Sequence, residues 1–334
     1  MKVLIVNQAE VAQWLPMHEC IDVMAEAFKM LAAGKTILPL RPIMWLPEKA
    51  GALGMMPAYV QDLNAMGLKV LTIFPGNHST PYDSHQGAVL LFEAKHGCLL
   101  AIMDATAITA IRTAAVSGVA TQWLAREDAH DLAILGAGTQ ARTHLEAMLL
   151  ARKITRVRVW SRKADRARQF AERESRRHGI TVESMEAAQE AVTNADIICT
   201  TTAANEPVVL GDWIKAGAHI NAVGACVPTA RELDTAAMLK SRLFVDRRES
   251  ALNEAGDFII AQKEGALDDN HIRGELGEIL LGQVQSRTSA KEITLFKSLG
   301  LAIEDLASAH HIYTKMLEKG AGTWIELGGS RHDL

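Results

Sequence analysis

The order of apolar and polar residues divides the chain into a strand-rich first part and a second part in which strands and helices alternate. Residues 3–6 predict a short strand, and Pro16 opens a helical run that ends before Gly34. Residues 105–125 again have helical periodicity, which makes the first part an α+β unit. The strands expected between them, separated by Gly, Pro, Asn and Asp, are Ile37–Leu46, Leu53–Tyr59, Gly67–Phe74, Gly87–Glu93 and Leu99–Asp104.

From residue 131 onward, strands separated by helices indicate right-handed βαβ crossovers and a parallel sheet. The expected strands are Leu132–Leu135, Val157–Trp160, Ile197–Thr200, His219–Val223 and Leu243–Val245, and the expected helices are Gln140–Leu150, 164–178 and 186–192. Two further helices, Thr294–Leu299 and Ile303–Glu318, are expected to return to the first domain. We therefore predict an α/β protein in which a Rossmann-type domain, 126–305, is inserted in an α+β domain formed by 1–125 plus 306–334.

Length and composition narrow the class of protein. The 334 residues suit two domains of roughly 150 residues each. A net charge of −4 and the absence of a basic stripe with aromatics argue against nucleic acid as a partner. The N-terminus does not resemble a signal peptide, and no apolar stretch reaches the ~18 residues of a membrane span, so we expect a cytoplasmic protein without a membrane partner. The four cysteines are far apart and form no Cys-x-x-Cys pair, so neither disulfides nor a metal site are expected.

A glycine motif follows the first strand of the second part. Gly136, Gly138 and Ala141 form G-x-G-x-x-A between a predicted strand and a predicted helix. Gly136 permits a tight turn, Gly138 lets a pyrophosphate approach the backbone, and Ala141 allows close packing of helix and strand. The motif predicts a dinucleotide site; the alternative is a glycine turn in an ordinary α/β domain.

The residues after the second strand bear on the choice of cofactor. Sites for NAD place Asp or Glu there to bind the ribose 2′-hydroxyl. This chain has Ser161, Arg162 and Lys163 instead, and Arg162 can pair with a 2′-phosphate to which Ser161 can donate. NADPH is therefore expected over NADH, unless Arg162 only begins a solvated basic helix.

Three cations of the first domain sit within apolar strand sequences, where an unpaired charge is costly. They are Arg41, Lys69 and Arg112. Each alone is readily explained by a salt bridge or by snorkelling to the surface. Together they suggest an anion site for which the chain itself supplies no anion.

The chain resembles the ornithine cyclodeaminase/mu-crystallin family over nearly its full length. The stretches that carry the resemblance are 55–59 (Met-Met-Pro-Ala-Tyr), 67–70, 84–86, 99–104, 108–117, 219–225, 274–278 and 296–300 (Phe-Lys-Ser-Leu-Gly). The resemblance implies a homodimer built through the first domain, a substrate cleft between the domains, and Arg41, Lys69 and Arg112 around a substrate carboxylate and imine. It also implies a cofactor lined by Thr139, Gln140, Ser161, Arg162, Thr201, Val223 and Ser298, with Lys163, His85 and Arg112 added as further candidates.

Two departures from the family pattern favour reduction over cyclodeamination. Cyclodeaminases and the related alanine dehydrogenases carry an Asp where this chain has Cys226, and cyclodeaminases carry a Glu where it has Gly54. A neutral thiol is a poor substitute for the carboxylate that moves protons on the substrate amine. Ketimine reductases and Δ1-pyrroline-2-carboxylate reductases of this family also have a small non-acidic residue at the Cys226 position, and reducing a preformed imine does not need that carboxylate.

We therefore expect NADPH-dependent reduction of a small, cyclic ketimine carboxylate, Δ1-pyrroline-2-carboxylate or Δ1-piperideine-2-carboxylate, to proline or pipecolate. In this hypothesis Arg41 binds the carboxylate and Lys69, with a pKa lowered by burial beside the arginines, supplies the proton. His85 is a second proton donor candidate, but it is assigned first to the cofactor. Cys226 shapes the pocket, and Glu254 either faces the substrate or is an exposed helix carboxylate.

Three other functions remain open at this point. The first is a family enzyme that uses NAD, either an ornithine cyclodeaminase or an amino-acid dehydrogenase. The second is a reductase of open-chain imines. The third is a mu-crystallin-like protein that binds NADPH and a ligand without turnover.

Overall fold

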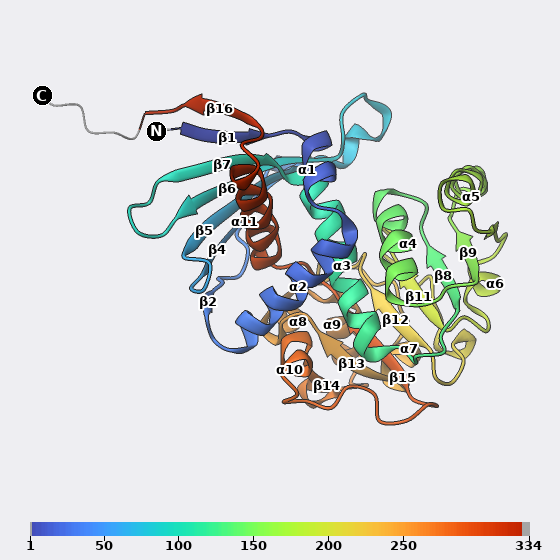
Figure 1. Ribbon diagram of the computed structural model, residues 1–334. Coiled ribbons are helices and arrows are strands. Elements are labelled where there is room, and N and C mark those ends of the chain that lie inside the picture. Colours follow the sequence, from blue (N-terminus) through green and yellow to red (C-terminus); the bar gives the residue numbers. More distant parts are fainter. Residues whose placement is uncertain (1, 329–334) are drawn as a thin grey trace, which may run out of the picture. The chain divides into compact units, whose positions relative to one another are not determined.

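The computed structural model describes residues 2–328, which form two compact units (Figure 1). The first unit is Met1–Arg112 with Leu301–Leu334, and the second is Thr113–Gly300. Both divisions lie earlier in the chain than the domain limits expected at 125 and 305, and the first falls inside helix α3 (Ala105–Leu124). The predicted fold class, a parallel-sheet Rossmann-type domain inserted in an α+β domain, is confirmed.

The first unit is built on an eight-stranded sheet of mixed direction in the order β16-β1-β7-β6-β5-β4-β2, with β3 paired to β4. Its strands are β1 (Lys2–Val6), β2 (Thr36–Ile37), β3 (Ile43–Trp45), β4 (Ala52–Val60), β5 (Ala65–Ile73), β6 (His85–Glu93), β7 (Leu99–Asp104) and β16 (Thr323–Glu326). Helix α11 (Ala302–Glu318) packs on β4, β5, β6 and β7, and α2 (Met17–Ala32) packs on α11 (Figure 1). Both helices therefore cover one face of the sheet.

Register decides which strand residues face these helices. Met56 pairs with Lys69, and Lys69 pairs with Val89. All three are buried, so they lie on the face that α11 covers. The next residues along, Met55 and Val70, face the other way and are only half-buried. The second face of the sheet is thus apolar and partly exposed.

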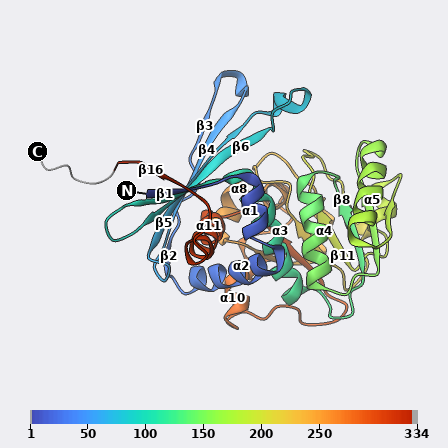
Figure 2. The same ribbon diagram turned by 45° about the horizontal axis from the view of Figure 1, so that its top comes forward.

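The segment 37–46 does not form the single strand expected from its apolar residues. Only β2 and β3 are extended in the sheet, and the residues between them, including Arg41, are irregular. Pro39 and Pro42 lack backbone N–H donors, so this segment cannot continue a hydrogen-bonded ladder. In Figure 2, β3 and β4 form a hairpin that projects upward beside the end of β6. Met44 and Trp45 of β3 are about half exposed.

The second unit contains an eight-stranded parallel sheet in the order β10-β9-β8-β11-β12-β15-β13-β14. Its strands are β8 (Asp131–Leu135), β9 (Arg156–Trp160), β10 (Val182–Ser184), β11 (Ile197–Thr200), β12 (His219–Ala222), β13 (Ser241–Val245), β14 (Ile272–Glu275) and β15 (Ile293–Lys297). The chain moves from β8 to β9 and β10 on one side and from β11 to β12 on the other. The direction therefore reverses between β8 and β11, and ligands of doubly wound folds bind at the carboxyl ends of the strands at such a point.

Helices connect many of the strands in both units. Those of the described chain not yet given bounds are α1 (Gln8–Trp14), α4 (Thr139–Ala151), α5 (Ala164–His178), α6 (Ala188–Val192), α7 (Thr235–Lys240), α8 (Arg248–Glu254), α9 (Gly256–Lys263) and α10 (Leu276–Leu280). Short 3-10 turns occur at η1 (Pro47–Lys49), η2 (Pro75–Ser79), η3 (Gly211–Trp213) and η4 (Asp269–His271). Among residues 2–328, no helix is both long enough and apolar enough to cross a bilayer.

The expected helix at Thr294–Leu299 is wrong, because these residues belong largely to strand β15. The strand lies between β12 and β13, and Leu295 and Phe296 are fully buried. A short apolar run buried on both faces of a parallel sheet shows no alternation, so its periodicity cannot distinguish a strand from a helix. The second expected helix, Ile303–Glu318, is present as α11.

The central position of β15 can be tested by truncating Phe296, which has no exposed surface. We expect Phe296→Ala to lower the free energy of unfolding by about 3–5 kcal/mol, because a large side chain is removed from a packed core. Denaturant titration followed by circular dichroism measures this change. Leu239→Ala, at a position that is 48% exposed, is the control and should change stability little. A small effect of Phe296→Ala would contradict the central strand.

Candidate functional site

The glycine turn after β8 has the geometry that the motif predicted. Gly136 has a φ of +116° and donates its N–H to the carbonyl of Trp160 at 2.8 Å. A Cβ at this position would lie 2.7 Å from Oγ1 of Thr201, in the loop that follows β11. Thr201 in turn donates through its N and Oγ1 to the carbonyl of Leu135. Gly136 and Thr201 therefore meet at the point where the strand order reverses, and only glycine fits there.

The next part of the motif is open. Gly138 is exposed and caps α4, and a Cβ there would meet nothing within 4 Å. The first turn of α4 contains Thr139 and Gln140 and has no acidic residue. Ala141 has no exposed surface, as expected for close packing of the helix on the sheet. Free amides and the positive end of a helix beside open space can hold a pyrophosphate.

One carboxylate, Glu232, joins the two loops that follow β11 and β12. Its Oε1 accepts from N and Oγ1 of Thr202 at 2.7 Å, and its Oε2 accepts from Oγ1 of Thr200 and from N of Gly224. Burial raises its pKa. Sequence analysis missed this residue, because nothing in a local pattern shows that a distant carboxylate reaches back to two strand ends.

Val223, Cys226 and Ser298 lie close together at the carboxyl ends of β12 and β15. Sγ of Cys226 is 3.2 Å from the carbonyl of Val223 and 3.9 Å from that of Ser298. The Ser298 Oγ is buried and has no hydrogen-bond partner among the described residues. Such an orphaned hydroxyl beside a strand end can serve a polar group of a bound cofactor, so the residues present fit a dinucleotide here.

A second buried pair lies next to this group. Lys297 and Asp257 are both about 1% exposed, and Nζ lies 2.9 Å from Oδ2. Asp257 also accepts the backbone N–H groups of Glu232 and Leu233. Desolvation opposes the charge of Lys297, but the carboxylate of Asp257 and the nearby Cys226 leave its pKa raised. This pair supports the loop that holds Glu232.

The end of β9 carries no carboxylate. Ser161 is half-buried, and Arg162 and Lys163 are exposed. Within the described part of the chain, the Arg162 side chain makes no ion pair. The first acidic residue that follows, Asp165, pairs with Arg168 at 2.5 Å. These side chains can accept a phosphate, but their exposure also fits a solvated basic helix.

In the first unit, Lys69 and Arg112 are brought together and are neutralised by two acids of α11. Lys69 Nζ lies 2.7 Å from Asp305 Oδ2, and Arg112 contacts Asp305 at 3.1 Å and Glu304 at 2.5 Å. The expectation that the chain supplies no anion here is therefore wrong. Two cations buried against the sheet need counter-charges, and adjacent acids at the start of α11 provide them. The sequence alone could not link these acids to the two cations, because they lie far away along the chain: more than 190 residues separate Arg112 from Glu304.

Burial and neighbouring charges shift the pKa values of this cluster. Desolvation and the positive charge of Arg112 lower the pKa of Lys69 to about 8, although the carboxylate of Asp305 opposes the shift. The expected downward shift is therefore confirmed. Burial opposes the charge of Arg112, but Asp305 and Glu304 outweigh it and raise its pKa. Lys69 is thus the cation of this cluster that loses its proton at the lower pH, around its pKa of about 8.

The other predicted substrate and cofactor residues are more peripheral within their units. Arg41 is half-buried and lies in the irregular segment between β2 and β3, not in a strand. Arg112, which is buried in the cluster described above, also lies outside a strand, in helix α3. His85 is exposed at the first residue of β6, where it pairs in register with Ile73 and has Nδ1 3.0 Å from Ser84 Oγ. Glu254 is half-buried at the end of α8.

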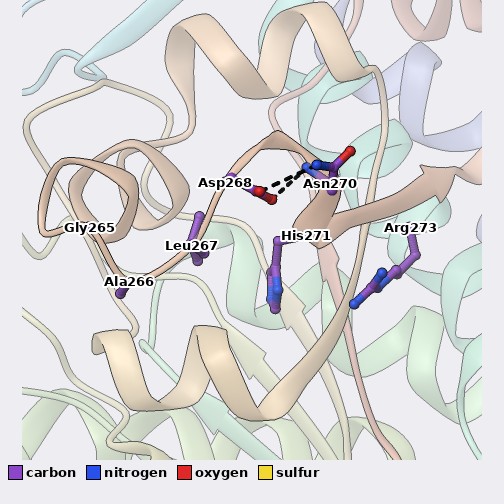
Figure 3. Close-up of a pocket in the computed structure, with 7 residues that line it drawn as sticks. All are labelled: Gly265, Ala266, Leu267, Asp268, Asn270, His271 and Arg273. Atoms are coloured by element: carbon purple, nitrogen blue, oxygen red, sulfur yellow. Dashed lines mark hydrogen bonds between the residues drawn. The ribbon is translucent and has the colours of Figure 1, made fainter.

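A pocket in the second unit holds none of the predicted residues. Figure 3 shows it within the loop that leads from α9 to β14, where Asp268 accepts from Asn270 and His271 lies nearby. His271 bonds to the carbonyl of Met238. Within residues 2–328, no group of three or more His, Cys, Asp or Glu side chains is placed to hold a metal ion.

Comparison with known proteins gives a consistent assignment. The sequence profile of the ornithine cyclodeaminase/mu-crystallin family matches residues 1–320. The ketimine reductase mu-crystallin of Mus musculus is 42% identical over 280 residues, 84% of this chain and 85% of that protein. The Δ1-pyrroline-2-carboxylate reductase of Thermococcus litoralis, solved with NADH and L-proline, superimposes with a TM-score of 0.93 at 43% identity, covering 96% and 99% of the two chains. An archaeal alanine dehydrogenase dimer with bound NAD gives 0.92 at 34% identity over 98% and 100%.

The different roles of the two motif glycines can be tested by the same substitution at each. Gly136→Ala should lower the free energy of unfolding by about 1–3 kcal/mol, because alanine is strained at positive φ and its Cβ would press on Thr201. Gly138→Ala should leave stability nearly unchanged, because the added methyl group enters open space. Thermal and denaturant unfolding measure both variants, and equal stability of the two would contradict this geometry.

Proposed function

Since the chain belongs to the ornithine cyclodeaminase/mu-crystallin family, we propose that it is a nicotinamide-dependent reductase of small carboxylated ketimines. The observation that carries the proposal is the cluster of Lys69 and Arg112, two buried cations with donors left over after their ion pairs are made. The relatives named as ketimine reductase and Δ1-pyrroline-2-carboxylate reductase support the same reaction. Cys226, in place of the Asp of cyclodeaminases and alanine dehydrogenases, supports reduction of a preformed imine over cyclodeamination.

The substrates we propose are cyclic, Δ1-pyrroline-2-carboxylate or Δ1-piperideine-2-carboxylate, and the products are proline or pipecolate. The Thermococcus litoralis reductase was solved with L-proline, which supports the five-membered ring. A ring carboxylate next to an imine needs a cation for the acid and a proton for the nitrogen. The Lys69–Arg112 cluster contains both kinds of group.

The unused donors of the cluster define the roles of its cations. Arg112 uses Nε and Nη1 for Asp305 and Glu304, and within the described chain Nη2 makes no hydrogen bond. In our proposal Nη2, with Arg41, binds the substrate carboxylate by charge-assisted hydrogen bonds. Lys69 has an ion pair with Asp305 and a weaker bond to Thr109 at 3.4 Å, which leaves a third N–H for the imine nitrogen.

The reaction adds a hydride and a proton across the C=N bond. A reduced nicotinamide supplies the hydride when bound in the second unit. Lys69 gives its proton to the imine nitrogen, so the carbon becomes more electrophilic, and addition of the hydride then gives the neutral secondary amine. Arg112 and Arg41 keep the carboxylate fixed, which restricts the orientation of the ring.

We further propose NADPH as the preferred form of the cofactor. Ser161, Arg162 and Lys163 support this proposal, because a guanidinium can pair with a 2′-phosphate and no carboxylate is present to repel it. The relatives solved with NADH or NAD show only that this family uses nicotinamide dinucleotides. His85 and Glu254 keep the cofactor and substrate roles proposed from the sequence.

A homodimer formed through the first unit is also proposed. The half-exposed, apolar second face of its sheet, with Met55, Leu68 and Val70, supports burial against a second copy. The alanine dehydrogenase relative was solved as a dimer. A cytoplasmic location stays a prediction from the sequence.

The proposal is tested by initial rates with both cyclic imines and with each reduced nicotinamide, followed by the loss of cofactor absorbance. We expect turnover with at least one imine. Pyruvate with ammonia, an open-chain imine source, and ornithine with NAD are assayed in parallel. Ammonia release from ornithine without imine reduction would replace the proposal by cyclodeamination, and cofactor binding without any turnover would indicate a binding protein.

The pH dependence of the rate follows from the role of Lys69 as an acid. Its ammonium is present below the pKa of about 8 and is lost as pH rises through that value, so kcat/KM should fall on the alkaline side. Lys69→Met should lower kcat roughly 100-fold or more and remove this limb. Lys35→Met, at an exposed ion pair with Asp62, is the control and should keep the wild-type profile. A wild-type profile in the Lys69 variant would exclude Lys69 as the donor.

Coenzyme preference is tested at Arg162. Arg162→Ala should raise the KM for NADPH about tenfold through loss of a charge-assisted bond, with little effect on NADH. Arg166→Ala, another exposed position on α5, is the matched control and should change neither value. If both variants behave alike, Arg162 is only part of a solvated helix.

A further inference from the structure

We propose that Asp305 is the positioning residue for Lys69: it keeps the buried amine as an ammonium with one N–H left for the imine nitrogen, while the adjacent Glu304 pairs with Arg112. The inference rests on the proposed function and adds to it two residues from the opposite end of the chain. It depends on which of the two buried acids, Asp305 and Glu304, contacts which of the two buried cations.

The division of contacts is uneven. Asp305 contacts both cations, with Oδ2 at 2.7 Å from Lys69 and Oδ1 at 3.1 Å from Arg112. Glu304 contacts Arg112 at 2.5 Å, and its other oxygen accepts the N–H of Leu301 at the start of α11. Consecutive helical residues point in different directions, so two neighbouring acids can reach different partners. Asp305 is the one carboxylate of the described chain in contact with Lys69.

Burial makes this contact necessary. Lys69 is 2% exposed, and Asp305 and Glu304 are 1% and 0% exposed. Without a counter-charge, desolvation and the neighbouring Arg112 would both favour loss of the lysine proton. An amine that is neutral at working pH cannot donate a proton to an imine. Asp305 therefore determines whether Lys69 carries the proton that it donates.

The remaining groups around the cluster do not replace Asp305. Thr109 on α3 is neutral and lies 3.4 Å from the lysine nitrogen. Cys20 on α2 interacts with Ser308, Glu304 and Arg112, but burial raises its pKa so far that the thiol stays neutral. Glu304 affects Lys69 only through space. Removing the charge of Asp305 should therefore have a larger effect on Lys69 than removing that of Glu304.

The test compares Asp305→Asn with Glu304→Gln, two adjacent and equally buried isosteric changes. In Asp305→Asn we expect the alkaline limb of kcat/KM to move at least about one pH unit lower, which lowers the rate about fivefold at the wild-type midpoint and about tenfold well above it. The rate should recover on acidification, and KM for the anionic substrate should not rise, because a negative charge has been removed. In Glu304→Gln the limb should move by less than about half a unit. Asp305→Glu, which keeps the charge, should restore most of the limb.

A substrate-free measurement separates this inference from the proposed function. Competitive labelling of lysines with trace acetic anhydride across pH, read by mass spectrometry, gives the titration midpoint of Lys69 in the intact protein. We expect a lower midpoint in Asp305→Asn and a nearly unchanged one in Glu304→Gln. If the wild type reduces no imine yet these midpoints differ as stated, the function fails while the role of Asp305 stands.

Two outcomes would overturn the inference. One is an unchanged Lys69 midpoint in folded Asp305→Asn, because the carboxylate would then not set the charge of the amine. The other is a Glu304→Gln shift of one unit or more, which also decides the matter if Asp305→Asn does not fold. A rise in KM with an unchanged limb in Asp305→Asn would indicate only a structural role.

Discussion

The structure of the first unit depends on neutralising two cations that its sheet and α3 bury. Lys69 and Arg112 cannot both be buried and stay charged without nearby carboxylates, because moving an ion out of water costs several kcal/mol. Both carboxylates come from α11, which the chain reaches only after completing the second unit. Segments from the two ends of the chain are therefore tied together by charge as well as by apolar packing of α11 on the sheet.

The same acids that allow burial also leave the cations reactive. Each cation keeps an unused donor, and the ammonium of Lys69 has a pKa lowered to about 8. A fully satisfied buried ion pair would only stabilise the fold. A pair with donors left over can bind an acidic ligand and exchange a proton, which is the chemistry of imine reduction.

In the second unit the buried carboxylate of Glu232 also holds distant segments together, but it does so by accepting hydrogen bonds from backbone N–H and hydroxyl groups. Glu232 fixes the loops after β11 and β12, and Asp257 with Lys297 fixes the segment that carries Glu232. These loops lie at the carboxyl ends of the central strands, where the motif glycines also lie. The position of a cofactor in a doubly wound sheet depends on such rigid loop ends.

The sequence by itself determined the features that arise from local order. Periodicity predicted most strands and helices, the spacing of Gly136 and Gly138 predicted the turn after β8, and Lys69 within an apolar strand predicted a buried amine of low pKa. Only the tertiary structure decided what depends on distant residues: the partners Asp305 and Glu304, the anchoring by Glu232, and the strand β15 mistaken for a helix. Local patterns report which face of an element is apolar, whereas the identity of the group that covers that face depends on how elements far apart in the chain pack.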